Sequence, residues 1–269
     1  MLRPRLVGSD VDGTLLAAAQ RPPSERTRTA VANVLAAGVP FILVTGRPPR
    51  WIPPVSRHFP GLRHAVCANG AVHYDIEDDR VLSGVTLAPE QLAELAAAVA
   101  EVLPGSWLAA ERLGLRALDE VSVPRVEMGK RPEWASDFLE EPRDRLLSEP
   151  AIKLLVRHEN LSSDAMLTAL RDRVGDDVSL TFSNPVGLLE CAAADVSKAS
   201  GLAQVAAELD IDVADVIVFG DMPNDIEMIE WAGHGVAMGG GHPLLAEIAD
   251  EVTAPADEDG VAMVLERWF

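Results

Sequence analysis

Two aspartates stand two positions apart near the N-terminus, in Asp10-Val11-Asp12-Gly13-Thr14. They follow a short apolar run and precede a tight turn, so both carboxylates can face one site at the end of a strand while Val11 exposes its carbonyl. Such a pair can supply a nucleophile, a general acid or base, or metal ligands. The motif is weak by itself, because Asp-Gly is also one of the commonest turn signals.

A second acidic group lies in Gly220-Asp221-Met222-Pro223-Asn224-Asp225, directly after the apolar run 216–219. Its polar residues therefore lie at the carboxyl end of a predicted buried strand. If these carboxylates and the first pair meet at one sheet edge, they repel one another unless a positive charge is present. Mg²⁺ and Lys198 would supply that charge, because an all-oxygen site suits a small hard cation and leaves a position for a phosphate oxygen.

Two further segments offer groups that can bind an anion. Thr45-Gly46-Arg47 follows another apolar run, which places a hydroxyl and approachable backbone N–H groups at the end of a strand. The segment could equally be a helix cap. Lys198 follows the capping residue Ser197 and would carry its charge near a helix N-terminus, with a solvated surface lysine as the ordinary alternative.

The elements that position these groups alternate between strand and helix. The sequence predicts strands at 6–9, 39–44 and 216–219, and helices that begin after Ser24 and after Ser197. A strand, a helix and a second strand within about 45 residues form a βαβ unit. This unit predicts a parallel sheet whose ligand sites lie beyond the carboxyl ends of its strands.

The middle of the chain has a different pattern. A hairpin around residues 77–79 and a helix over 92–102 precede short strands near Trp107, near Leu115, at 152–156 and at 178–182, with a second helix over 163–173. The stretch 121–149 has no assignable pattern. We therefore expect an α/β protein with a Rossmann-like parallel-sheet core, formed by 1–83 and 188–269, and an inserted α+β cap domain at 84–187.

Composition limits the classes of partner. The 269 residues carry a net charge of -19, so the surface repels nucleic-acid phosphates and anionic lipid headgroups. Cys67 and Cys191 lie far apart, and the six histidines lack the spacing of a metal site, which predicts free thiols and no structural zinc. No signal peptide or membrane-spanning pattern is evident, so we expect a cytoplasmic protein that binds a small molecule.

The ordered motifs resemble those of one known family. Asp10–Thr14, Thr45–Arg47, Val196–Lys198 and Gly220–Asp225 look like the four motifs of the haloacid dehalogenase (HAD) superfamily, specifically its Cof-type (subfamily IIB) phosphatases, whose C2-type cap is inserted between the second and third motifs. Three more segments are similar to further signatures of that family: Asn69–Ala71, Gly235–Met238 and Asp259–Ala262. The chain departs from the pattern at Ala199, where Gly is usual, and at Gly239–Gly241, where Gly-Asn-Ala is common.

The resemblance implies a role for each motif residue. Asp10 would be the nucleophile that forms an aspartyl-phosphate, and Asp12 would protonate the leaving alcohol and then deprotonate the hydrolytic water. The implied catalytic set is Asp10, Asp12, Thr45 and Lys198, and the substrate-binding set is Thr45, Gly46, Arg47, Lys198 and Asn224. The implied residues of the Mg²⁺ site are Asp10, Val11, Asp12, Asp221 and Asp225.

The expected function is that of a Mg²⁺-dependent phosphatase that hydrolyses small phosphorylated metabolites, with sugar phosphates as the expected class and the leaving group recognised by the cap. Two alternatives stay open. A sugar-phosphate mutase would share the nucleophile motif and the cap class. A non-catalytic regulator that binds a phosphometabolite is opposed by the Asp10/Asp12 pair, because a pure binder gains nothing from two carboxylates that face an anion.

Overall fold

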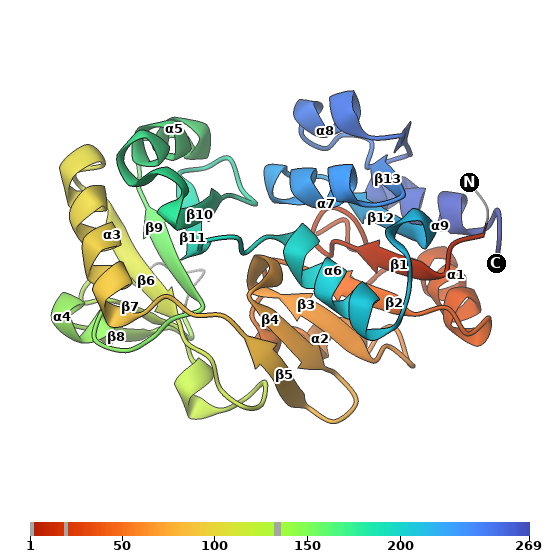
Figure 1. The fold of residues 1–269 in the computed structure, drawn as a ribbon, viewed down its shortest axis with the longest axis horizontal. Helices are drawn as coiled ribbons and strands as arrows, with labels where there is room; N and C mark the ends of the chain where they lie inside the picture. The colour runs from red at the N-terminus through yellow and green to blue at the C-terminus, as the bar shows by residue number, and fades with distance from the viewer. Residues whose placement is uncertain (1–2, 19–20, 132–135) are drawn as a thin grey trace. The chain divides into compact units, whose positions relative to one another are not determined.

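The computed structural model describes residues 3–18, 21–131 and 136–269, and the chain divides into two compact units (Figure 1). The core unit comprises Met1–Leu82 and Ser197–Phe269, and the inserted unit comprises Ser83–Val196. The first boundary lies one residue from the expected one. The second lies after residue 196 rather than 187, because residues 188–193 form a strand that pairs within the sheet of the inserted unit.

The core unit is built on an eight-stranded sheet among the described residues, in the order β14-β13-β12-β1-β2-β3-β4-β5. The strands from β14 to β3 pair in parallel, and β4 runs antiparallel to β3. This confirms the expected parallel core. The strands are β1 (Leu6–Ser9), β2 (Phe41–Val44), β3 (His64–Cys67), β4 (Val72–Asp75), β5 (Arg80–Gly84), β12 (Val216–Gly220), β13 (His234–Ala237) and β14 (Glu251–Val252).

Two helices of the core unit begin at the predicted serine caps. Helix α1 (Glu25–Ala36) follows Ser24, whose hydroxyl accepts a hydrogen bond from the Thr27 amide at 3.0 Å. Helix α6 (Lys198–Glu208) follows Ser197, whose hydroxyl accepts from the Ser200 amide at 3.2 Å. The remaining helices of this unit are α2 (Pro53–Ser56), α7 (Ile226–Trp231), α8 (Pro243–Ile248), α9 (Gly260–Leu265) and the 3₁₀ turns η1 (Pro49–Trp51), η2 (Ala68–Gly70), η6 (Val213–Asp215), η7 (Pro223–Asp225) and η8 (Ala256–Glu258).

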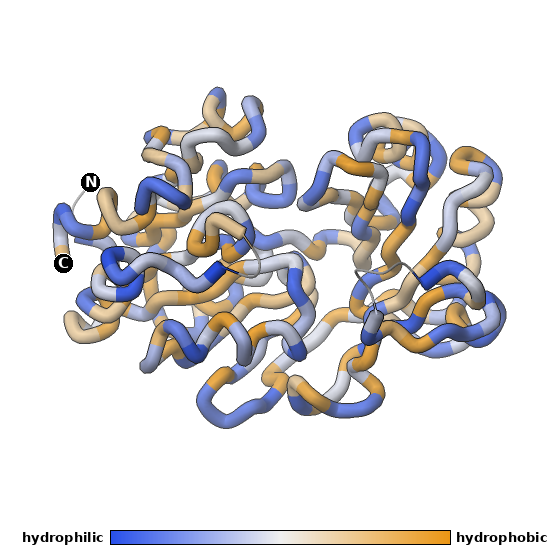
Figure 2. The backbone as a smooth tube through the Cα atoms, turned by 180° about the vertical axis from the view of Figure 1, so that it is seen from behind, coloured by the Kyte–Doolittle hydropathy of each residue, from blue (hydrophilic) through white to orange (hydrophobic). Residues whose placement is uncertain are grey.

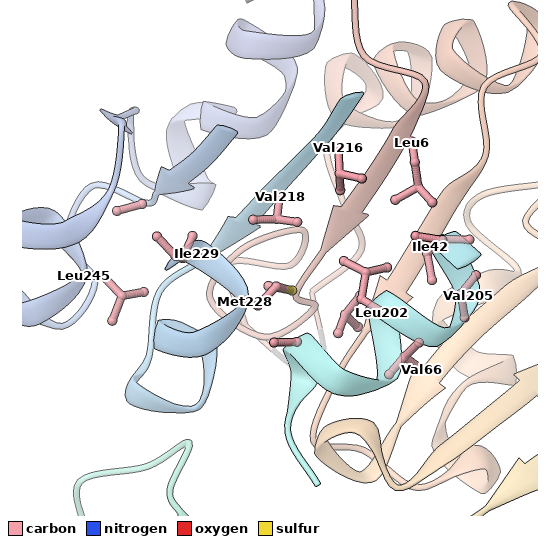
Figure 3. Close-up of a cluster of buried hydrophobic side chains, with 14 residues drawn as sticks. Leu6, Ile42, Val66, Leu202, Val205, Val216, Val218, Met228, Ile229 and Leu245 are labelled. Atoms are coloured by element: carbon pink, nitrogen blue, oxygen red, sulfur yellow. The ribbon is translucent and has the colours of Figure 1, made fainter. Parts of the chain in front are cut away.

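Helix α6 packs its apolar side against one face of the core sheet (Figure 3). Its Leu202 and Val205, both 0% exposed, contact strand residues that include Leu6 and Ile42. Burial of a side chain of this size stabilises the fold by about 1.5–3 kcal/mol. Helices α1 and α9 contact each other, and α1 also contacts β2.

The inserted unit contains a six-stranded sheet among its described residues, in the order β10-β11-β9-β6-β7-β8. Its neighbouring strands are antiparallel except β7 and β8, which are parallel, as expected of an α+β unit. Its elements are α3 (Pro89–Val102), β6 (Trp107–Glu111), η3 (Glu120–Ser122), β7 (Arg125–Glu127), β8 (Leu139–Glu141), α4 (Arg143–Leu146), β9 (Lys153–Arg157), α5 (Ser163–Val174), η5 (Gly175–Asp177), β10 (Val178–Thr181) and β11 (Leu188–Ala193).

One predicted strand of the inserted unit is wrong. Leu115 lies in an irregular loop with 77% of its surface exposed. The amides of Leu115 and Arg116 donate to the Asp119 carboxylate at 2.8 and 3.0 Å, so a side chain takes the place of a neighbouring strand. The unassigned stretch 121–149 contains two strands of three residues each, β7 and β8, which are too short to show an alternating pattern.

Hydrophobic and hydrophilic residues alternate along the helices, as expected of helices with one buried face (Figure 2). In α3 the residues Leu92, Leu95 and Val99 are buried, whereas Glu94 is exposed. Within the described ranges no helix combines the length and the apolar character needed to cross a membrane. Cys67 and Cys191 are both buried thiols, as predicted.

Candidate active site

Polar residues follow three neighbouring strands of the core sheet. Asp10 follows β1, Thr45 follows β2 and Asp221 follows β12. Because β12, β1 and β2 are adjacent and parallel, these residues meet at the carboxyl edge of the sheet. The segments that begin at Asp10, Thr45 and Gly220 therefore converge in space. They lie far apart along the chain, and Thr14 and Asp221, for example, are 207 positions apart.

Asp10, Asp221 and Asp225 form a compact acidic cluster in which one carboxylate oxygen from each lies within 4.8 Å of the others. Burial raises the pKa of Asp10 well above its usual value, while Lys198 lowers it and the neighbouring aspartates raise it. Burial, and then the charge of Asp225, raise the pKa of Asp221 to about 6. The crowded carboxylates fit a metal ion, because a bound cation would offset both their mutual repulsion and their burial.

Lys198 is the first residue of α6 and its side chain is completely buried. The ammonium donates to Asp10 Oδ1 at 2.5 Å and to Asp225 Oδ1 at 2.6 Å. Burial opposes the charge of Lys198, but the two carboxylates outweigh burial and raise its pKa. A lysine has three N–H donors, so the ammonium can offer the third to a substrate oxygen. The alternative of a solvated surface lysine is excluded.

Asp225 supports both the lysine and the loop that carries Asp221. Its Oδ2 accepts hydrogen bonds from the backbone amides of Asp221 and Met222, each at 3.0 Å. Gly220 leaves the room that this arrangement needs, because a Cβ there would lie 2.5 Å from the Cβ of Asp225. Both carboxylate oxygens of Asp225 thus accept hydrogen bonds from other residues of the chain. This fits a residue that positions the metal site more than one that serves only as a metal ligand.

The Asp12 carboxylate is outside the acidic cluster, although the sequence analysis included it in the metal site. Arg47 holds it in a two-pronged ion pair, with Nε at 2.7 Å from Oδ2 and Nη2 at 2.6 Å from Oδ1. The Asp12 side chain is 45% exposed, so solvent and a leaving group can reach it. Arg47, expected among the substrate-binding residues, is engaged by Asp12 in this conformation.

The carbonyl of Val11 already has a partner inside its loop. It accepts a hydrogen bond from the Leu16 amide at 2.8 Å, and the Gly13 amide donates to the Leu16 carbonyl at the same distance. These two bonds close the turn after β1. A carbonyl oxygen has two lone pairs, so this bond leaves one lone pair for the expected metal ligation, which stays a prediction.

The remaining predicted residues lie in the loops around the cluster. Thr45 is 1% exposed, and its hydroxyl accepts from the Arg47 amide at 3.2 Å. Gly46, between them, is half-buried. Asn224 is 8% exposed and its Nδ2 donates to Asn69 Oδ1 at 3.1 Å.

Two contacts with Asp221 involve residues to which the sequence analysis gave no role. Thr14 Oγ1 donates to Asp221 Oδ1 at 3.0 Å. Gly13 has a φ of 86°, and a Cβ there would lie 2.2 Å from Asp221 Oδ2. Thr14 was visible only as part of the Asp-Val-Asp-Gly-Thr motif, and no local signal connects it with an aspartate so far along the chain.

The glycine run 239–241 also packs on the Asp221 loop. A Cβ on Gly241 would lie 2.7 Å from the Asp221 carbonyl oxygen, which also accepts a hydrogen bond from the His242 amide at 2.7 Å. The departure from Gly-Asn-Ala at this run thus lies next to the acidic cluster.

Comparison with known families gives a match over nearly the whole chain. The family described as haloacid dehalogenase-like hydrolase matches residues 7–265, which include every motif segment described above. The chain belongs to the haloacid dehalogenase-like hydrolases. Membership of this HAD family confirms the resemblance recognised from the motifs.

Two relatives that match this HAD hydrolase over nearly their whole length are named as phosphatases. The chain is 30% identical to "Putative phosphatase YxeH" of Bacillus subtilis (strain 168), over 98% of this chain and 97% of the relative. It is 27% identical to the 5-amino-6-(5-phospho-D-ribitylamino)uracil phosphatase YitU of the same organism, over 99% and 98% of the two chains. These matches confirm the expected enzyme class, a phosphoric monoester hydrolase of the HAD type.

A solved structure shows the same fold. A sugar phosphatase of HAD subclass IIB superimposes with a TM-score of 0.81 at 20% sequence identity, over 98% of both chains. At that identity the likeness concerns the fold, an α/β core with an inserted α+β unit.

Proposed function

We propose that this HAD hydrolase is a Mg²⁺-dependent phosphatase that hydrolyses small phosphorylated metabolites, with sugar phosphates as the expected class, through an aspartyl-phosphate at Asp10. The contact that carries the proposal is the hydrogen bond between the buried Lys198 ammonium and Asp10 Oδ1, beside the acidic cluster. The names of the relatives support a phosphatase, and one fold neighbour is a sugar phosphatase.

Asp10 and Asp221 would hold the metal ion, with Asp225 fixing the loop between them and Lys198. Their oxygen-only donor set is the type that Mg²⁺ prefers, and the repulsion among them is what a divalent cation would relieve. When bound, the ion would offset negative charge on the phosphoryl oxygens and orient the phosphate.

In the first step a carboxylate oxygen of Asp10 forms a bond to phosphorus as the bond from phosphorus to the leaving oxygen breaks. Before this step Asp12 leaves the Arg47 ion pair and takes up a proton from solvent, and it then gives that proton to the leaving oxygen, which departs as an alcohol. The Asp12 side chain is exposed enough to contact the leaving oxygen. Its contact with Arg47 would thus be replaced by this contact.

In the second step water attacks the phosphorus of the aspartyl-phosphate. Asp12, now ionised, takes a proton from that water, and the oxygen of Asp10 leaves as a free carboxylate with release of inorganic phosphate. Lys198 and the Thr45 hydroxyl hold the phosphoryl oxygens during both steps, so this chain's own residues supply the nucleophile, the acid and base, and the positive charge.

The test is phosphate release from a panel of phosphorylated metabolites, with Mg²⁺ and with excess EDTA. We expect release that needs Mg²⁺ and is fastest with sugar phosphates. A sugar-phosphate mutase would release little phosphate and need a bisphosphate activator, and a regulator would bind ligand without turnover. Full activity in EDTA would contradict the metal requirement.

A further inference from the structure

A short turn after β3 has an unusual backbone. Ala68, Asn69 and Gly70 have φ values of 50°, 56° and 106°. Two consecutive non-glycine residues in the left-handed region are costly, and such strain is kept where the surrounding structure requires it, often at functional sites. Ala68 and Asn69 are buried, at 0% and 4% exposure, so the turn is enclosed rather than a free surface loop.

The backbone of this turn is bonded to the loop after β2. The Asn69 amide donates to the Thr45 carbonyl at 3.0 Å, and the Ala68 amide donates to the Arg47 carbonyl at 2.9 Å. Thr45 and Arg47 are two of the residues expected to bind the substrate phosphate. The strained turn therefore fixes the backbone of the loop that carries them.

The third residue of the turn lies against the start of α6. A Cβ on Gly70 would lie 1.9 Å from the Ser197 carbonyl oxygen, and a Cβ on Gly201 would lie 2.8 Å from the Gly70 Cα. Only glycine permits this approach at position 70. Lys198 follows Ser197 directly, so the turn also touches the helix end from which the buried ammonium projects.

The Asn69 side chain makes the remaining connection. Its Oδ1 accepts a hydrogen bond from Asn224 Nδ2 at 3.1 Å, and both side chains are buried. Asn224 Oδ1 is buried and has no hydrogen-bond partner among the described residues. An unpartnered buried polar atom is rare and costly, and at a ligand site it indicates a group that a ligand satisfies. The Nδ2 of Asn224 is thus held by Asn69, whereas its Oδ1 has no hydrogen-bond partner among the described residues.

We propose that Asn69 is a positioning residue that aligns the Asn224 amide for the substrate phosphoryl group. This inference rests on the proposed function. Backbone conformation alone does not account for Asn69, because glycine would adopt the left-handed conformation with less strain and could not bond to Asn224. The Asn224 amide keeps a second N–H for a phosphoryl oxygen, and its Oδ1 can accept from a substrate hydroxyl or a protonated phosphoryl oxygen.

The variant Asn69→Gly tests this role, because it removes the side chain and keeps a residue that favours the left-handed backbone. We expect kcat/KM to fall about 10-fold and the dissociation constant of inorganic phosphate to rise about 10-fold, the size of one buried hydrogen bond. The Mg²⁺ concentration for half-maximal activity should match that of the wild type. A merely structural role would lower the Tm but leave phosphate affinity unchanged.

Asp210→Gly is the matched control, since Asp210 also has a left-handed φ, of 53°, and is exposed in the same unit. It should leave phosphate affinity unchanged. Asn224→Ala should lose as much affinity as Asn69→Gly or more, and the double variant should lose no more than Asn224→Ala alone. Losses that multiply in the double variant, or Asn69→Gly kinetics equal to those of Asp210→Gly, would overturn the proposal.

Two readouts keep this test separate from that of the proposed function. Calorimetric titration of inorganic phosphate in the presence of Mg²⁺ needs no turnover, so an inactive wild type would contradict the phosphatase proposal without deciding the role of Asn69. Side-chain amide resonances of wild-type Asn69 and Asn224, assigned with the two variants, should both shift on phosphate addition. If neither moves, the proposal is wrong even where a variant fails to fold.

Discussion

The two aspartates of the first motif differ sharply in burial and in partners. Asp10 is 5% exposed and bonded to Lys198, whereas the Asp12 side chain is 45% exposed and paired with Arg47. Identical side chains two positions apart are thus placed in different electrostatic surroundings. The buried one beside a fixed cation suits a nucleophile, and the exposed one suits proton exchange with a leaving group and with water.

Replacement of Asp12 tests the acid and base role. Asp12→Ala should lower kcat on an alkyl phosphate by about 10² to 10⁴, the usual contribution of a general acid or base. The loss should be smaller on p-nitrophenyl phosphate, whose leaving group needs no proton. Initial rates on both substrates give the comparison, and an equal loss on the two would remove Asp12 from the acid role.

Thr14 offers a test of the support around the acidic cluster. Thr14→Val removes the hydrogen bond to Asp221 Oδ1 and keeps the size of the side chain, so the Mg²⁺ concentration for half-maximal activity should rise about 10-fold or more. Thr29→Val is the matched control, because the Thr29 hydroxyl bonds only within α1, to the Glu25 carbonyl, among the bonds described. A Mg²⁺ titration that is identical for wild type and Thr14→Val would contradict this support.

Helices and strands with local signals were predictable from the sequence. The caps of α1 and α6 lie at the predicted serines, and β1 spans the predicted residues, because a cap or an apolar run is encoded within a few positions. β7 and β8 were missed because three residues carry no periodicity. The predicted end of the inserted unit, residue 187, was wrong for a related reason. The residues of β11 carry no local signal that the strand pairs with β9 and β10.

The sheet of the inserted unit contains a buried charge network that crosses three strands. Lys153 on β9 lies 3.3 Å from Glu111 Oε2 on β6 and 2.8 Å from Glu190 Oε2 on β11. Ser183 donates to the other oxygen of Glu190 at 2.6 Å. Burial opposes the charge of Lys153, yet the two carboxylates outweigh burial and raise its pKa.

Loss of the lysine would remove the ammonium that both buried carboxylates contact. Lys153→Met should therefore lower the free energy of unfolding by about 3–5 kcal/mol. Arg173→Met is the control, because Arg173 pairs with Glu101 on the surface, with side chains 49% and 61% exposed, and should cost about 1 kcal/mol or less. Urea unfolding measures both, and equal losses would show that the network contributes no more than a surface ion pair.

At the scale of the whole molecule, the proposed catalytic and metal-site residues belong to the core unit, while residues 83–196 form a unit with their own sheet and helices. The order of the motifs along the chain predicted an inserted unit between the second and the third motif, and the inserted unit ends at residue 196 rather than at the predicted 187. The contacts that complete the site, such as Thr14 with Asp221 and Asn69 with Asn224, join residues 207 and 155 positions apart. No local pattern encodes such pairs, so only the fold reveals them.

The corrected boundary predicts which fragment folds alone. Residues 83–196 contain all six strands described for their sheet, whereas 84–187 lack β11, which lies between β10 and β9. The longer fragment should unfold in a cooperative transition followed by circular dichroism, and the shorter one should not. Cooperative unfolding of both with the same Tm would place the true boundary before β11.

The most direct measurement of the central claim is phosphate release by Asp10→Asn in the presence of Mg²⁺. The asparagine keeps the shape of the side chain but removes the nucleophilic oxygen and one charge of the acidic cluster. We predict that release from p-nitrophenyl phosphate falls to the uncatalysed background while circular dichroism shows a folded protein. Substantial release by folded Asp10→Asn would contradict the assignment of Asp10 as the nucleophile.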